Sequence, residues 1–287
     1  PPQNTHDPPR DGSPRAYLSS VAELPSEMTF EVPLRAQQDG PPVKPKDAAT
    51  VMLLHDGADG LEVFLQHRVA GMPFAGGMTV FPGGGVDKRD ADASISWAGP
   101  PPRLWAEWFG CDESLARALV CAAVRETFEE SGVLLAATDT GIVKDTAPYA
   151  YAREALVSRE LSLAAFLAEA GLTLRADLLR PWANWITPER EPRRYDTRFF
   201  VATLPEGQDA DGATTEADSS GWQRPEDAIA DAQYGRRTLM PPTWMTLSEL
   251  SEFTSAEEAL SAERSIRPII PTLVREGDKV RVVMEPQ

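Results

Sequence analysis

The pattern of apolar and polar positions along the chain predicts a mixture of strands and helices. Residues 48–55 are an almost continuous apolar run and residues 62–69 alternate, with a short acidic loop containing glycine between them. This arrangement is typical of a β-hairpin. Elsewhere, apolar residues at intervals of three or four predict helices, and short apolar runs bounded by glycine or proline predict strands. The expected strands are 48–55, 62–69, 78–81, 181–187 and 197–204, the expected helices are 112–131, 151–170, 225–233 and 243–253, and a hairpin is expected around Glu276, Gly277 and Asp278.

The helix expected to begin at Asp112 or Ser114 and to end before Gly132 has two different faces. One is an apolar stripe, which predicts packing in a core. On the other side, three glutamates fall within an arc of roughly 100°. Carboxylates this close raise one another's pKa, and a divalent cation such as Mg²⁺ relieves the repulsion. The alternative is a solvated helix with an ordinary Arg125–Glu129 pair. The stripe consists of Val120, Cys121, Val124 and Phe128, and the acidic face of Glu126, Glu129 and Glu130.

A glycine-rich loop precedes this helix. Residues 81–85 read FPGGG, and glycine lets a backbone approach a phosphate or a metal ion closely because it has no Cβ. The loop and the acidic helix together therefore predict a site built from two parts.

These residues resemble the signature of the Nudix family, with three departures. Asp90 stands where the signature has Glu, Thr127 takes an apolar position, and 34 residues rather than seven separate Asp90 from Arg125. The insertion, and the stretches RVAGMPFAGGMTVFPGG and WITPEREPRRYDTRFFVATLP, are similar to the coenzyme A diphosphatase branch related to mammalian Nudix type 19. The resemblance extends over roughly residues 48–250 and implies an α/β fold, a Nudix-type α/β/α sandwich with a mixed sheet plus a helical insertion. The matching positions are Gly84, Arg125, Glu126, Glu129, Glu130, Gly132 and Val133.

The resemblance also implies roles for individual residues. It implies Mg²⁺ or Mn²⁺ held by the three glutamates and by the carbonyl group of Gly83, with Arg125 orienting the glutamates and Asp90 bracing the loop. The expected metal ligands are Gly83, Glu126, Glu129 and Glu130, and the expected catalytic residues are Arg125, Glu126 and Glu216.

The general base and the substrate contacts are less constrained by the signature. Glu216 is the first candidate for a distant carboxylate, ahead of Asp218 and Asp209, and the alternative is a solvated loop acid. Paired guanidinium groups suit phosphates, although each arginine can instead pair with Glu189 or Glu191 at the surface. Strand aromatics can stack on an adenine, but burial is the favoured interpretation. The arginines are Arg68, Arg193 and Arg194, and the aromatics are Trp182, Trp185 and Phe199.

The chain is divided into a tail, 1–27, expected to be flexible, and a single Nudix domain, 28–287, with the insertion at about 91–111. The insertion contains Trp97, Trp105 and Trp108, which makes it too aromatic for a disordered linker. Two interpretations remain open. It is either a helical flap against the body or against a second copy in a homodimer, or a segment that fills the core.

Composition limits the partners. The net charge is −16 and the pI is about 4.7, which argues against a general nucleic-acid or membrane surface. No run approaches the ~18 apolar residues of a membrane span. Two cysteines, Cys111 and Cys121, are expected to be reduced thiols, and the C-terminal MEPQ is not a peroxisomal address. We therefore expect a cytoplasmic location and a small nucleotide substrate.

The expected reaction is hydrolysis of coenzyme A or acyl-coenzyme A to 3′,5′-ADP and (acyl-)4′-phosphopantetheine, as the resemblance implies. The alternatives are hydrolysis of ADP-ribose, of a dinucleotide or of another nucleoside diphosphate derivative. A non-catalytic module that binds a nucleotide and regulates a partner is a third possibility, which the three intact glutamates disfavour.

Overall fold

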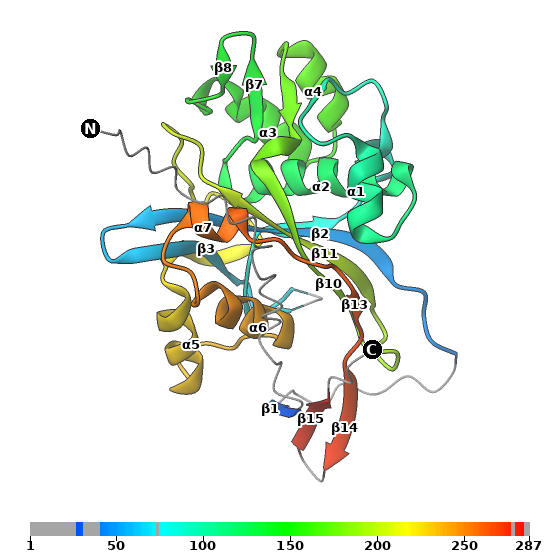
Figure 1. Ribbon diagram of the computed structural model, residues 1–287, viewed down its shortest axis with the longest axis vertical. Coiled ribbons are helices and arrows are strands. Elements are labelled where there is room, and N and C mark those ends of the chain that lie inside the picture. Colours follow the sequence, from blue (N-terminus) through cyan, green and yellow to red (C-terminus); the bar gives the residue numbers. More distant parts are fainter. Residues whose placement is uncertain (1–26, 31–40, 73–74, 277–278, 284–287) are drawn as a thin grey trace, which may run out of the picture.

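The computed structural model describes residues 27–30, 41–72, 75–276 and 279–283. A mixed eight-stranded sheet forms the middle layer, and helices cover both of its faces (Figure 1). Its strands are β2 (Lys46–Gly57), β3 (Gly60–Arg68), β4 (Thr79–Val80), β5 (Gly83–Gly85), β10 (Leu179–Ile186), β11 (Tyr195–Thr203), β12 (Ala217–Gln223) and β13 (Pro268–Ile269). The expected α/β sandwich with a mixed sheet is confirmed.

The strand order of this sheet is β12-β3-β2-β11-β10-β13, with β4 beside β3 and β5 beside β2. Strands β2 and β11 are parallel, as are β10 and β13, and the other pairs are antiparallel. Strand β2 is shared: its first half pairs with β5 and its last residues pair with β3. This division brings the glycines of β5 onto the central strand.

Helices α1 to α4 lie on one side of the sheet, and α5 and α6 on the other (Figure 1). The α-helices are α1 (Pro102–Phe109), α2 (Glu113–Ser131), α3 (Ala150–Val157), α4 (Leu163–Glu169), α5 (Pro225–Gln233), α6 (Pro241–Leu250) and α7 (Ala256–Ser261), and the 3₁₀ helices are η1 (Lys88–Ala91), η2 (Ala147–Tyr149) and η3 (Ala176–Leu178). None of the helices in the described part of the chain combines the length and apolar character needed to span a bilayer.

Two smaller sheets complete the structure. A four-stranded sheet has the order β6-β9-β7-β8, and a three-stranded sheet has the order β1-β15-β14. Their strands are β1 (Glu27–Phe30), β6 (Trp97–Ala98), β7 (Ala136–Thr138), β8 (Gly141–Ile142), β9 (Thr173–Arg175), β14 (Thr272–Glu276) and β15 (Lys279–Val283). The predicted C-terminal hairpin is present as β14 and β15, although its turn at 277–278 lies outside the described residues, as do residues 1–26 of the predicted tail.

Each face of the main sheet has its own core. Alternation along the strands divides them: Phe64 and Phe200 pack with α1 and α2, whereas Leu65 and Val201 pack with α5, α6 and α7. Buried area of this kind is the main stabilising contribution to the fold. Of the candidate adenine-stacking aromatics, Trp182, Trp185 and Phe199 are all buried in the second core, so the interpretation as core residues holds.

The insertion fills the first core. Trp105 of α1 is fully buried and packs against Phe200 of β11, with ring centroids 5.5 Å apart. Trp97 and Trp108 are partly buried against the same cluster. Of the two interpretations of residues 91–111, the structure therefore supports a core segment over a flap.

Two expectations are corrected, and two features of the fold were not predicted. Residues 151–170 are two helices, α3 and α4, because Arg159 adopts a left-handed φ of 63° and Ser162 caps a new helix. Residues 206–220, EGQDADGATTEADSS, lack apolar periodicity and are therefore expected to be an acidic loop, but their last residues belong to the strand β12, which pairs with β3 at the edge of the sheet. Helix α7 and the four-stranded sheet were not expected, since their elements are only two to six residues long.

Candidate active site on helix α2 and strand β5

Helix α2 is held at both ends by local sequence. The side chain of Asp112 accepts a hydrogen bond from the amide of Leu115, and Gly132 takes the left-handed conformation, with φ of 73°, that ends the helix. The predicted start and stop are confirmed. Unlike a surface helix, α2 is buried on nearly all sides, because small residues such as Ala122 and Ala123 let neighbouring elements approach closely.

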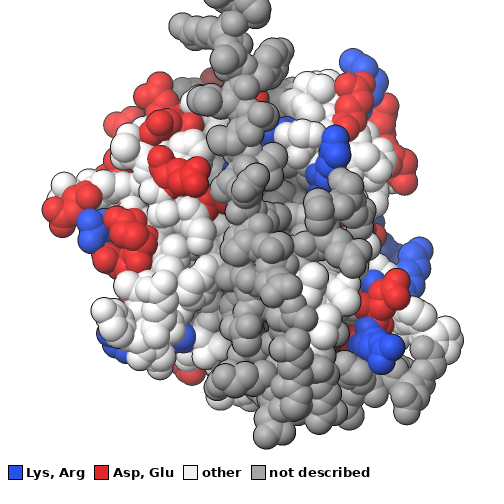
Figure 2. All heavy atoms as spheres, turned by 60° about the horizontal axis from the view of Figure 1, so that its bottom comes forward, with Lys and Arg blue, Asp and Glu red and all other residues white. Residues whose placement is uncertain are grey.

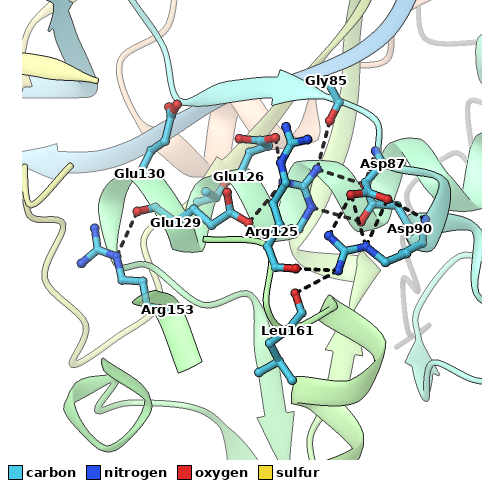
Figure 3. A network of polar contacts seen from close by, with 12 residues as sticks. Gly85, Asp87, Asp90, Arg125, Glu126, Glu129, Glu130, Arg153 and Leu161 are labelled. Carbon is cyan, nitrogen blue, oxygen red and sulfur yellow. Dashed lines mark hydrogen bonds and ion pairs between the residues drawn. The ribbon is translucent and has the colours of Figure 1, made fainter. Parts of the chain in front are cut away.

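Arg125 is the centre of the polar network (Figure 3). Its guanidinium donates to the carboxylate of Glu126 at 2.7 Å and to that of Glu129 at 3.2 Å. It also donates to the carbonyl oxygen of Gly85 at 3.0 Å and, through Nε and Nη2, to both oxygens of Asp90 at 3.1 and 3.0 Å. One arginine thus fixes two of the glutamates relative to the glycine strand.

Asp90 takes the position of the signature glutamate. It is 1% exposed, and its second oxygen also accepts from the amide of Asp87 at 2.8 Å, within a capping box at the start of η1. The shorter side chain reaches because the η1 turn brings the backbone of Asp90 to Arg125. Asp90 therefore links Arg125 to the loop backbone at Asp87, which is consistent with the expected bracing role.

The glycines of β5 lie directly over the glutamates. A Cβ on Gly84 would come within 2.5 Å of Oε1 of Glu126, so only glycine fits there while Glu126 keeps its place. The amide of Gly83 donates to Oε2 of Glu130 at 2.9 Å. The signature residues before and after the insertion therefore meet in space, although about 40 residues separate them in the chain.

Burial is the largest effect on the pKa values of the three glutamates. It raises the pKa of Glu126 to about 7, against the opposing effect of the Arg125 charge. Burial and the charge of Glu126 raise the pKa of Glu130 well above its ordinary value, and burial also raises the pKa of Glu129. For Arg125, burial lowers the pKa, but the nearby carboxylates outweigh it and keep the guanidinium charged. The site therefore holds more acidic groups than the single positive charge of Arg125 can keep ionised at their ordinary pKa.

Glu216 lies at the edge of this site. It accepts a hydrogen bond from Arg68 at 2.6 Å, and its charge contributes to the raised pKa of Glu130. Its side chain is 47% exposed, so water reaches the carboxylate. Asp209 and Asp218, the other candidates, are exposed. Arg68, predicted to contact phosphate, is paired with Glu216 in this structure.

The other two predicted phosphate contacts differ in their surroundings. Arg193 is exposed. Arg194 is 8% exposed, and it donates to the carbonyl oxygens of Thr187 at 3.0 Å and Val43 at 2.8 Å. These bonds hold the start of β11 in place, so a role of Arg194 in substrate binding stays a prediction that competes with a structural one.

Two residues that were not predicted from the sequence, Arg153 and Gln66, donate hydrogen bonds to the backbone of the glutamates. Arg153 of α3 donates to the backbone oxygen of Glu129 at 3.0 Å (Figure 3). It also donates to both oxygens of Asp211 at 2.8 Å. Gln66 of β3 donates to the backbone oxygen of Glu130 at 3.0 Å. No local pattern marks these residues, because each bond joins segments distant in the sequence.

The oxygen-bearing side chains of the site can be compared with those that bind a divalent cation in proteins. As the side chains stand, no three His, Cys, Asp or Glu residues among those described converge on one point. The chemistry nevertheless fits: three glutamates share a buried region, and burial raises the pKa of each. Hard oxygen donors with uncompensated charge are what Mg²⁺ and Mn²⁺ prefer.

The glycine strand, the carboxylate helix and the sheet have the arrangement that the resemblance to Nudix proteins predicts, and comparison with known proteins points to the same class. The profile of the NUDT19 Nudix domain matches residues 112–250. The crystal structure of a NUDIX hydrolase from Alicyclobacillus acidocaldarius superposes with a TM-score of 0.65 at 28% identity, covering 77% of this chain and 98% of that one. The chain is therefore similar to Nudix hydrolases, and among them it resembles the NUDT19 branch.

Two curated relatives are similar over most of the chain. Putative nudix hydrolase 7 of Caenorhabditis elegans is 29% identical over 197 residues, covering 68% of this chain and 58% of that protein. Acyl-coenzyme A diphosphatase NUDT19 of Xenopus laevis is 25% identical over 235 residues, covering 69% of this chain and 61% of that protein. The matched region thus spans about three-fifths of the length of these relatives.

Proposed function

We propose that the protein is a divalent-metal-dependent hydrolase of the phosphoric anhydride in nucleoside diphosphate derivatives. The observation that carries the proposal is the Arg125 network, which holds a set of buried carboxylates against the backbone of a glycine strand. The substrate we propose is coenzyme A or an acyl-coenzyme A, cut to 3′,5′-ADP and (acyl-)4′-phosphopantetheine. Support for this choice comes from the NUDT19 profile and from the relative named acyl-coenzyme A diphosphatase.

Glu126, Glu129, Glu130 and the carbonyl group of Gly83 are the proposed ligands of Mg²⁺ or Mn²⁺. When bound, the metal supplies positive charge to the phosphoryl oxygens and lowers the pKa of water. The chain's own residues do the positioning. Arg125 keeps the glutamates on one side of α2, and Asp90 keeps Arg125 in place through two hydrogen bonds.

Glu216 is the proposed general base. It is open to water, and Arg68 orients it. A carboxylate in such a position accepts the proton of an attacking water molecule. Arg68 is also a proposed phosphate contact, through guanidinium nitrogens other than the Nη2 that donates to Glu216. Arg193 is a second proposed phosphate contact because its side chain is exposed.

A set of substrates identifies the leaving group. Coenzyme A, an acyl-coenzyme A, ADP-ribose and a dinucleotide are incubated with Mg²⁺ or Mn²⁺, and the products are identified by mass. We expect the coenzyme A compounds to give 3′,5′-ADP with the highest kcat/KM. Cleavage of ADP-ribose or the dinucleotide with no cleavage of coenzyme A would disprove the substrate while leaving the hydrolytic chemistry intact.

A further inference from the structure

A polar cavity of about 380 Å³ lies on the side of the main sheet opposite the glutamates. Leu65 and His67 of β3 line it, and Leu65 packs in the core of α5 to α7, whereas its neighbour Phe64 faces α2. Strands β4 and β12 and the segment after α5 form the other walls. Most of the lining is therefore on the face of the sheet away from the carboxylates, but the cavity reaches the edge strand β12, where Trp222, which also lines it, packs against the first core.

The lining of the cavity favours an anion. Arg236 and Arg237 both line it, together with the neutral polar groups of Thr79, Ser219 and Gln223. The lining residues, all of them in the described part of the chain, include no Asp or Glu. In a chain with a net charge of −16, two adjacent arginines in a polar cavity without a carboxylate in its wall form a local positive field.

Arg237 is incompletely paired. Its Nη1 donates to Oγ1 of Thr79 at a long 3.4 Å, and its Nη2 lies 3.7 Å from Asp231. Its Nε is buried and has no hydrogen-bond partner among the described residues. Asp231 makes shorter bonds to Arg236, at 2.6 and 2.8 Å, and to Gln223, at 2.9 Å. Burial lowers the pKa of Arg237. The charge of Asp231, which Arg237 shares with Arg236, opposes this effect only in part.

The backbone holds these arginines in place. The amide of Thr79 donates to the carbonyl oxygen of Thr238 at 2.9 Å, and Thr79 forms a β-bridge with Leu239. The guanidinium of Arg236 lies over the ring of Tyr234, 4.8 Å from its centroid. Donors that are already fixed lose little entropy when a ligand binds.

We propose that this cavity binds a phosphomonoester group through the guanidinium groups of Arg236 and Arg237 and the hydroxyl groups of Thr79 and Ser219. A dianionic phosphate has enough acceptor oxygens for two guanidinium groups and neutral donors together. The site goes beyond the proposed hydrolysis, since it contacts none of the carboxylates. The phosphate is either a remote group of the hydrolysed nucleotide or part of a separate molecule.

Binding is measured by calorimetry in EDTA, with inorganic phosphate and adenosine 3′,5′-bisphosphate as probes. Changing Arg237 to Gln should weaken both at least about tenfold, because a charged hydrogen-bond donor is lost. The matched control is Arg224→Gln, since Arg224, the N-cap residue of α5, pairs with Asp227 of that helix and does not line the cavity. Binding to Arg237→Gln as tight as to the unchanged protein, or no saturable binding at millimolar phosphate, would overturn the proposal.

A second variant covers the case in which Arg237→Gln does not fold. Ser219 is exposed on the edge strand β12, so Ser219→Asp adds a carboxylate to the wall without removing a buried group. It should repel phosphate and abolish detectable binding. Unchanged phosphate affinity in Ser219→Asp would contradict the proposal as firmly as the first test.

Two further measurements identify the source of the phosphate and distinguish this proposal from the proposed hydrolytic function. If coenzyme A is the substrate, as proposed above, and its 3′-phosphate occupies the cavity, Arg237→Gln raises KM for coenzyme A but not for dephospho-coenzyme A. If a separate molecule binds, neither KM changes while phosphate binding still falls. Because the binding assay needs no turnover, Glu129→Gln should bind phosphate normally, and failure of hydrolysis does not affect the result.

Discussion

Gly84 and Gly85 are neighbours in β5, but a Cβ would meet very different surroundings at each. At Gly84 it would lie 2.5 Å from the Glu126 carboxylate, and at Gly85 nothing lies within 4 Å. Gly84→Ala should therefore displace Glu126 and lower kcat by about 10²-fold, the loss typical of a disturbed charge-stabilising group. Gly85→Ala should have a much smaller effect. Steady-state kinetics on both variants tests this, and equal losses would mean that the fit around Gly84 is not what matters.

Asp90 and Asp87 form a second matched pair at the scale of residues. Asp90 is buried and binds Arg125 through two hydrogen bonds, whereas Asp87 pairs with Arg89 near the surface. Asp90→Asn leaves Arg125 short of a buried counter-charge and should lower the free energy of unfolding by about 3–5 kcal/mol. Asp87→Asn should cost less than about 1 kcal/mol, since Asn also caps helices well. Urea denaturation compares the two, and similar midpoints would contradict the bracing role of Asp90.

The raised pKa of Glu126 predicts how stability varies with pH. The pKa is about 7 in the folded protein and near its ordinary 4.5 when unfolded, so between these values the folded state binds more protons. The free energy of unfolding of the metal-free protein should therefore fall as pH rises from about 4.5 to 7. Thermal unfolding in EDTA at several pH values measures this, with Glu126→Gln as the reference. A wild-type protein that gains stability over this window relative to Glu126→Gln would refute the prediction.

At the scale of elements, α2 serves the core and the site at once. Val124 is fully buried on α2, whereas Val157, on α3, is 52% exposed. Val124→Ala should lower the free energy of unfolding by about 2 kcal/mol, from lost burial and the remaining cavity. Val157→Ala should change it by less than about 0.5 kcal/mol. If Val124→Ala instead unfolds normally but loses activity, the faces of α2 have been assigned wrongly.

The elements that the sequence predicted well are those with a dense local signal. The start of α2 at Asp112, its end at Gly132 and the buried strands β2 and β3 follow from capping residues and apolar runs. Strand β12 was missed because its sequence, ADSSGWQ, is polar, and only its pairing with β3 makes it a strand. The division of 151–170 was missed because an arginine, not a glycine, takes the left-handed conformation at position 159.

At the scale of the whole molecule, the signature predicted which residues of α2 and β5 meet, but not what surrounds them. The acidic stretch after β11 is tied to the end of α2 by Arg153 and Asp211, and Gln208 satisfies the backbone of Leu134. Such bonds depend on the three-dimensional arrangement of the chain. On the face shown in Figure 2, the described Lys and Arg side chains are scattered among acidic groups and form no continuous basic patch. That distribution suits local recognition of a small anion in a cavity.

The central claim is that the carboxylates of α2 act on a diphosphate with the help of a divalent cation. The most direct measurement is hydrolysis of coenzyme A by metal-stripped protein during titration with Mg²⁺ or Mn²⁺, alongside Glu129→Gln. The account predicts no turnover in chelator, saturable recovery with metal, and kcat lower by roughly 10² or more in Glu129→Gln at unchanged thermal stability. Full turnover in EDTA, or a Glu129→Gln protein as active as the unchanged one, would contradict it.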